Sequence, residues 1–126
     1  MSLLPSVTHT GNNSQSLLAA FMTDALVVLS TFSNEKDALR IGSALVEARL
    51  AACVNVLPTV RSIYRWKGEI EHSDESLLLI KTTRQVFPAL RDRLKEMHSY
   101  QTPEIVAVPI VDGLFVYLDW LTEQVS

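Results

Sequence analysis

Residues 64–70 read Tyr-Arg-Trp-Lys-Gly-Glu-Ile, and this stretch decides the fold prediction. Tyr64 and Trp66 fall on one face of an extended strand, because successive side chains of a strand point to opposite faces. Lys67 and Gly68 then interrupt the run, and Gly68 can take the positive φ that a tight turn demands. The strand pattern resumes directly afterwards. The stretch therefore predicts a β-hairpin with a large aromatic side chain at its mouth, in which Tyr64 and Gly68 have structural roles.

The segments around this hairpin alternate between strand and helix patterns. Short apolar runs indicate strands, and apolar residues at helical spacing indicate amphipathic helices. The predicted strands are 25–32, 53–66, 77–82 and 105–111. The predicted helices are 35–51, a second with apolar positions 87, 90, 94 and 97, and a third over 114–124. The polar residues 72–75 predict a break before the third strand.

The resulting order, β-α-β-β-α-β-α, predicts an α+β fold. Its core is the ferredoxin-like βαββαβ sandwich, in which two helices cover one face of an antiparallel sheet, with an extra C-terminal helix. The strand over 53–66 is long for so small a domain, and a long strand leaves an unpaired edge that must be covered. We therefore expect ring-like homo-oligomerisation through strand pairing between subunits.

Composition limits the class of protein. The 126 residues fit one domain, which we place at 24–126 behind a flexible N-terminal leader over 1–23. A single cysteine excludes an intramolecular disulfide and fits a reducing compartment. The net charge of −3 argues against nucleic acid or an anionic membrane as partner. No lysine or arginine precedes Lys36, so the positive start of a secretory signal is absent.

Five segments, in order and correctly spaced, carry a family resemblance. They read Leu-Val-Glu-Ala-Arg-Leu-Ala-Ala-Cys-Val-Asn (45–55), Tyr-Arg-Trp-Lys-Gly-Glu-Ile (64–70), Leu-Ile-Lys-Thr (79–82), His-Ser-Tyr-Gln-Thr-Pro-Glu-Ile (98–105) and Tyr-Leu-Asp-Trp-Leu (117–121). Over about residues 25–125 the chain resembles the CutA proteins, the divalent-cation-tolerance family. The resemblance implies a ferredoxin-like fold, a stable homotrimer built by inter-subunit strand pairing, a cytosolic location and a role in tolerance of copper and other divalent metals. It also implies structural similarity to the PII signalling proteins.

His98 is the candidate metal ligand that the resemblance points to, and copper is the cofactor it suggests. Imidazole is a common copper ligand, but a copper centre needs three or four donors. At the positions where relatives carry further donors or a proline, this chain has Ser30, Met97 and Ser99. Met97 could offer a thioether to Cu(I), although it also fits an apolar helix face. The alternative for His98 is a capping or interface role at the end of a helix.

A small-ligand pocket is the second candidate site. Its predicted residues are Trp66, Lys81, Tyr100 and Glu104. The alternative for Trp66 is packing at a subunit interface, which aromatic residues do well. Lys81 lies in an otherwise apolar strand, where an unpaired charge is costly. We expect it to pair with a carboxylate across the sheet or the subunit seam.

The remaining residues of reactive type favour structural roles. Cys53, between alanines and valine, is typical of a small buried hydrophobic residue rather than a redox or metal site. The four glycines are scattered, so there is no phosphate-binding loop, and no metalloprotease or nucleophile-elbow motif is present. The sequence thus favours a non-enzymatic trimer that acts in metal tolerance. The alternatives are a PII-like signalling trimer that binds a small anion at the seam, or a structural trimer whose partner is another protein.

Overall fold

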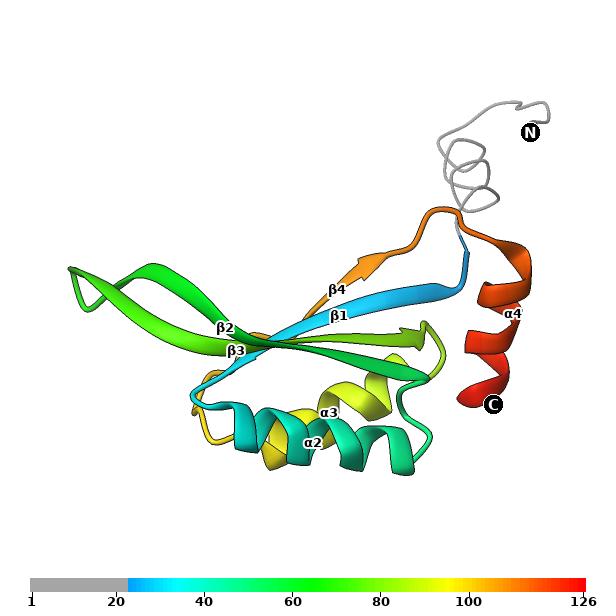
Figure 1. Ribbon diagram of the computed structural model, residues 1–126, viewed down its shortest axis with the longest axis horizontal. Helices are drawn as coiled ribbons and strands as arrows, with labels where there is room; N and C mark the ends of the chain where they lie inside the picture. The colour runs from blue at the N-terminus through cyan, green and yellow to red at the C-terminus, as the bar shows by residue number, and fades with distance from the viewer. Residues whose placement is uncertain (1–22) are drawn as a thin grey trace, which may run out of the picture.

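Four strands and three helices make up the part of the chain that the computed structural model describes, residues 23–126 (Figure 1). In order they are β1 (Ala25–Phe32), α2 (Glu35–Glu47), β2 (Cys53–Trp66), β3 (Glu69–Thr83), α3 (Phe87–Met97), β4 (Val106–Pro109) and α4 (Phe115–Gln124). The predicted order is confirmed. The predicted leader lies outside the described residues except for Thr23. Among the described helices, none is both long and apolar enough to cross a membrane.

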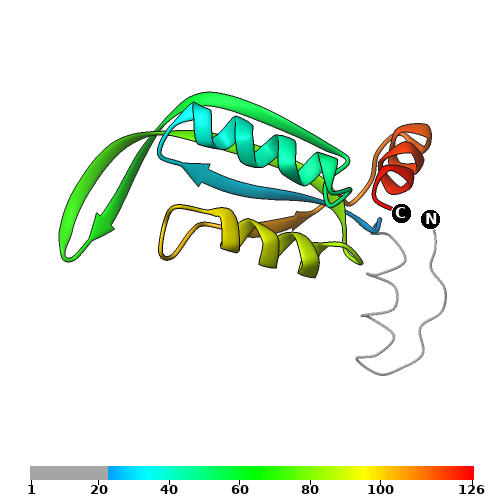
Figure 2. The ribbon, with the colours of Figure 1, turned by 90° about the horizontal axis from the view of Figure 1, so that it is seen from below.

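The strands form one antiparallel sheet in the order β2-β3-β1-β4. Helices α2 and α3 lie side by side on one face of this sheet, as the two views in Figures 1 and 2 show. This arrangement is the α+β, ferredoxin-like sandwich that the sequence predicts. Between the sheet and the two helices lies the main core, which contains Val28, Phe32, Ala38, Ile41, Leu45, Ala51, Leu78, Ile80, Leu90 and Leu94. Helix α4 lies beyond the end of the sheet and packs Leu121 against Ala25 and Ala52.

Helix α2 begins at a well-formed N-cap. The Asn34 side-chain oxygen accepts a hydrogen bond of 2.8 Å from the backbone N–H of Asp37, which satisfies one of the donors that a helix start leaves free. Two carboxylates, Glu35 and Asp37, lie in the first turn, where the helix dipole favours them. The helix ends at Glu47, four residues earlier than predicted, and the chain reverses through Arg49 with a φ of 61°.

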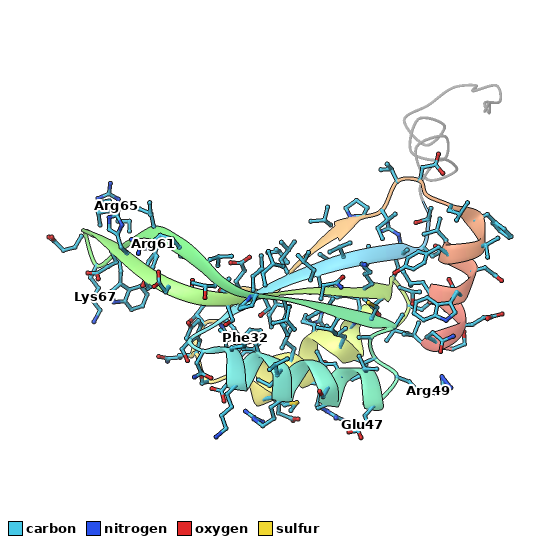
Figure 3. The ribbon with its side chains drawn as sticks, in the orientation of Figure 1. Phe32, Glu47, Arg49, Arg61, Arg65 and Lys67 are labelled. Atoms are coloured by element: carbon cyan, nitrogen blue, oxygen red, sulfur yellow. The ribbon has the colours of Figure 1, made fainter. Side chains whose placement is uncertain are left out.

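The β2–β3 hairpin has the turn that the sequence predicts. Lys67 and Gly68 both have positive φ, 51° and 83°, which is the requirement of a two-residue turn matched to the twist of the strands. A shift of register between Leu57 and Val60 marks a bulge at Pro58. The hairpin extends well beyond the rest of the molecule, and Arg61, Arg65 and Lys67 project from this extension (Figure 3).

The predicted break at residues 72–75 is wrong. Strand β3 is continuous over fifteen residues, and His72, Asp74 and Glu75 pair in register with Ile63, Arg61 and Val60 of β2. In this part of the hairpin only two of the described strands run side by side, so polar side chains can meet solvent and do not end the strand. At the other end of the chain, β4 is shorter than predicted and keeps only residues 106–109 of the expected 105–111.

Loss of the α2 cap gives a direct test of this helix boundary. Replacing Asn34→Ala is expected to lower the free energy of unfolding by about 1 kcal/mol, because the Asp37 N–H loses its acceptor. Chemical denaturation followed by circular dichroism measures the change. Asn34→Ser, which retains a capping oxygen, is the matched control and is expected to stay close to the native protein. Equal losses in both variants would contradict the capping role.

Candidate functional site

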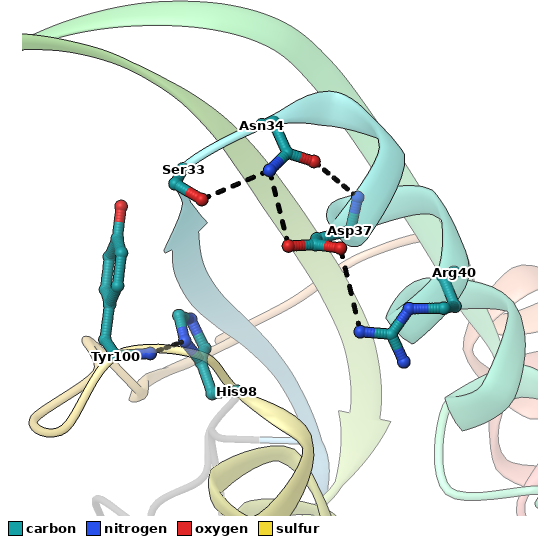
Figure 4. Close-up of polar contacts among 6 residues, drawn as sticks. All are labelled: Ser33, Asn34, Asp37, Arg40, His98 and Tyr100. Atoms are coloured by element: carbon teal, nitrogen blue, oxygen red, sulfur yellow. Dashed lines mark hydrogen bonds and ion pairs between the residues drawn. The ribbon is translucent and has the colours of Figure 1, made fainter.

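The imidazole of His98 is held on both of its nitrogens. His98 is the C-cap of α3 and is only 8% exposed. Its Nε2 lies 2.8 Å from the carbonyl oxygen of Thr31. Its Nδ1 accepts a hydrogen bond of 3.1 Å from the Tyr100 backbone N–H (Figure 4). Because a carbonyl can only accept, Nε2 must carry the hydrogen. His98 is therefore a neutral imidazole with no lone pair left over, which matches the helix-end role rather than that of a ligand.

Aromatic contacts and one short hydrogen bond complete this cluster. The His98 ring stacks on Phe32 with centroids 4.4 Å apart and on the other side contacts Tyr100 at 4.8 Å. The Tyr100 hydroxyl donates to Glu75 Oε2 at 2.7 Å. The loop after α3 is thus fixed to the end of β1 and to β3. Burial, and then the bond to Glu75, raise the pKa of Tyr100 well above its ordinary value.

The position of His98 also lowers its pKa. Burial disfavours the imidazolium form, and this effect exceeds the opposing influence of the Thr31 carbonyl and of the carboxylates of Glu75 and Asp37. Protonation would place a hydrogen on Nδ1, directly against the Tyr100 N–H. The geometry and the direction of the pKa shift therefore agree that the folded protein favours the neutral ring.

The other residues expected near a metal do not complete a copper centre. Met97 packs half-buried against the main core. Ser30 is fully buried on β1, and its hydroxyl has no hydrogen-bond partner among the described residues. Within residues 23–126, no three His, Cys, Asp or Glu side chains come together as metal ligands. The donors present in one chain do not fit a copper site in this geometry.

An open polar hollow lies beside the His98 cluster. It is lined by the turn between β1 and α2, the β2 bulge and the middle of β3, specifically Ser33, Asn34, Glu35, Pro58, Thr59, Asp74, Glu75 and Ser76. Asp74 is paired with Arg61 at 2.8 Å, and Ser76 Oγ donates to the Pro58 carbonyl at 2.6 Å. These contacts already satisfy much of the lining. None of the four predicted pocket residues takes part in it.

One chain does not bring the predicted pocket residues together. Trp66 pairs with Glu69 at the hairpin tip, twelve residues before Lys81 on the same strand β3. At about 3.3 Å per residue, this separation is on the order of 40 Å. Tyr100 lies between them beside Glu75, and Glu104 is exposed in the loop before β4. A common pocket would need residues from more than one subunit.

Of the two predicted partners of Lys81, a single chain can show only the carboxylate across the sheet; a carboxylate across the subunit seam stays a prediction. No described carboxylate pairs with it across the sheet; its Nζ instead donates to the Tyr117 hydroxyl at 3.5 Å and lies 5.7 Å from the centre of that ring. Tyr117 in turn contacts Trp120, with ring centroids 5.5 Å apart. In the sequence, the spacing of three residues on a predicted helix already indicates that these two aromatic rings are neighbours. Cys53, opposite Lys81 on β2, is half-buried rather than fully buried.

Comparison with known proteins agrees with this fold. The family described as CutA1 divalent ion tolerance protein matches residues 26–124. The chain belongs to this family. The divalent-cation tolerance protein CutA of Thermus thermophilus is 56% identical over 98 residues, which are 78% of this chain and 95% of that protein. The human Protein CutA is 48% identical over 99 residues, 76% of this chain and 55% of its own length.

Solved structures of CutA proteins share the architecture. That of the Thermus thermophilus protein superposes with a TM-score of 0.79 at 53% identity and covers 81% of this chain and 99% of its own. That of CutA1 from Oryza sativa gives a TM-score of 0.80 at 35% identity, with 84% and 97% covered. A third, from Archaeoglobus fulgidus, is described as a periplasmic divalent cation tolerance protein and gives 0.78 at 40% identity, with 81% and 99% covered.

The buried neutral His98 gives a pH prediction with a definite sign. Its pKa is lower in the folded chain than the ordinary value of 6.5, so the unfolded chain takes up the proton first. The stabilising contribution is complete above pH 6.5 and is lost as the pH falls through the folded pKa. Denaturation measured between pH 8 and pH 5 should therefore show a falling free energy of unfolding below pH 6.5.

His98→Gln is the control, because it removes the titrating group while other acidic and basic groups stay the same. The difference in unfolding free energy between the native protein and this variant should shrink as the pH falls. A difference that is constant across the whole range would show that His98 is not held neutral.

Proposed function

We propose that this protein acts in the response to and tolerance of divalent metal ions as a cytoplasmic homotrimer, and that it is a binding protein rather than an enzyme. Family membership supports the metal-tolerance role most directly. Self-association is supported by the amount of apolar surface that the single chain leaves exposed. Apolar side chains more than a third exposed occur on the hairpin, β4 and α4, among them Ile63, Tyr64, Trp66, Ile70, Val106, Val108, Leu114, Phe115, Val116 and Trp120.

Large apolar side chains left exposed in such number indicate surfaces that a partner covers. The outer edge of β2 adds an independent reason, because β2 is the first strand in the sheet order and pairs only with β3 among the described strands. Its free backbone N–H and C=O groups can pair with a strand of another subunit. A trimer would cover both features at once. Nucleic acid and membranes are not proposed as partners, in line with the acidic net charge.

The second part of this proposal is a direct contact with copper, in which His98 is the ligand and Met97 a weak second donor. Both His98 nitrogens are already bonded, so a metal would have to displace the Tyr100 N–H or the Thr31 carbonyl. That requirement makes the expected affinity weak. It also means that metal binding and release of the 98–104 loop would occur together.

Trp66 tests the trimer through its packing. It is 58% exposed in a single chain, and in a trimer we expect it to pack against another subunit. Light scattering should give a mass of three times 14.1 kDa for the native protein. Trp66→Ala is expected to lower the midpoint of thermal dissociation, whereas Arg65→Ala, on the opposite face of the same strand, should have a much smaller effect. A native mass of one chain would overturn the proposal.

Calorimetric titration with Cu(II) and Zn(II) tests the metal contact. Weak binding is expected for the native protein and is expected to be reduced in His98→Ala. His72→Ala, which removes a histidine of the exposed hairpin, controls for general binding to surface imidazole. If the native protein and His98→Ala bind copper equally, His98 has no part in the function.

A second function is favoured by one observation: the cation of Lys81 lies beside the ring of Tyr117, which in turn contacts Trp120. This arrangement supports a PII-like signalling trimer that binds a small anionic ligand.

A further inference from the structure

Lys81 is a cation on an apolar sheet face. In β3 the alternate residues Leu78, Ile80 and Thr82 are buried toward α2 and α3, so Lys81 points to the opposite, open face. The register places Val27 of β1 and Cys53 of β2 directly beside it on that face. Neither neighbour can neutralise an ammonium group. The local surroundings therefore favour an added anion.

The chain does not supply that anion itself. Among residues 23–126, every salt bridge joins an arginine to an aspartate, and none includes Lys81. Residues 1–22 contain no aspartate or glutamate, so they cannot provide a carboxylate side chain either. The only polar contact of the ammonium among the described residues is the Tyr117 oxygen at 3.5 Å. Lys81 keeps its other two N–H groups for a further acceptor.

One aromatic ring, that of Tyr117, lies next to this cation, and a second, that of Trp120, lies next to Tyr117. Tyr117 and Trp120 lie three residues apart on α4, with ring centroids 5.5 Å apart, and remain 38% and 40% exposed. Because the Tyr117 oxygen accepts from Lys81, its own hydrogen is available to donate to an anion. The exposed surface of these rings can stack against a planar group of a ligand. Binding of that ligand would be tighter if it also carried a negative charge that pairs with Lys81.

We propose that Lys81, Tyr117 and Trp120 form a binding site for a small planar aromatic anion, that is, a ring that carries a phosphate or a carboxylate. The anionic oxygen accepts hydrogen bonds from the Lys81 ammonium and the Tyr117 hydroxyl, and the ring of the ligand stacks on Trp120. This inference rests on the second function proposed above, and it gives that function a site within one chain. It needs neither a metal nor Trp66, which lies on β2 at the tip of the hairpin.

Fluorescence can detect binding at this site alone. The chain has two tryptophans, so Trp66→Phe leaves Trp120 as the only indole. In that full-length background, titration with adenosine monophosphate and with nicotinate should change Trp120 fluorescence saturably. Adenosine supplies a ring without the anion and inorganic phosphate an anion without the ring, and both are expected to bind at least about tenfold more weakly. Saturable binding of either aromatic anion supports the site.

Variants connect the signal to the named side chains. Lys81→Met keeps the length of the side chain but removes the charge, and should weaken binding by about tenfold or more, as expected for a lost hydrogen bond to a charged group. Lys81→Arg should restore most of the affinity, and Tyr117→Phe should weaken binding less than Lys81→Met. Rescue by arginine would separate a ligand contact from a purely structural role.

Two results would overturn the site. One is no saturable response to either aromatic anion. The other is equal binding by Lys81→Met, together with a fall in oligomer mass, which would show that another subunit supplies the anion for Lys81. A thermal-shift screen distinguishes this failure from failure of the signalling function. If some other anion stabilises the native protein and Lys81→Met equally, the signalling function stands and only this site is removed.

Discussion

The pairing of β2 with β3 is the constraint on which the rest of the molecule depends. The two strands remain paired from Cys53 and Lys81 to the turn at Lys67 and Gly68. Near Lys81, β1 and β4 complete the sheet, and the helices bury one of its faces. Near the turn, the described residues provide no third strand and no helix, so the same pairing becomes an exposed two-stranded ribbon. A ribbon of this kind is only marginally stable in water by itself. Its exposed Ile63, Trp66 and Ile70 therefore favour contact with another subunit.

The end of β1 is where this ribbon joins the packed part of the chain. Thr31 and Phe32 hold His98, and Glu75 of β3 holds Tyr100, so one short loop connects the helical layer to the start of the ribbon. The same contacts occupy both nitrogens of the residue that the family resemblance marks as the metal ligand. Rigidity of this junction and ready metal binding are therefore opposed in a single chain. A histidine at the right place in the sequence is insufficient evidence for a metal site when its ring is already fully hydrogen-bonded.

Local patterns account for most of the fold but for little of the site. Gly68 predicts the turn, because glycine takes a positive φ without a steric penalty, and the bulge falls at Pro58, which has no backbone N–H to donate to the ladder. The break predicted from the polar residues 72–75 is wrong, because polarity alone cannot distinguish a loop from a strand that is exposed on both faces. The partners of His98 could not have been predicted at all: Thr31 is 67 residues away, and only the assembled sheet brings it within hydrogen-bond distance. Lys81 and Tyr117, 36 residues apart, present the same difficulty.

The open face of the sheet is where the remaining chemistry gathers. Helices α2 and α3 cover the other face with a closed apolar core, so they leave little there to recognise a ligand. On the open face, the register aligns Val108, Val27, Lys81 and Cys53 in one row, and α4 brings Tyr117 next to Lys81. An apolar row that contains one cation is suited to two kinds of occupant at once. Another subunit can cover the valines, while a small anion can neutralise Lys81 where the covered area ends.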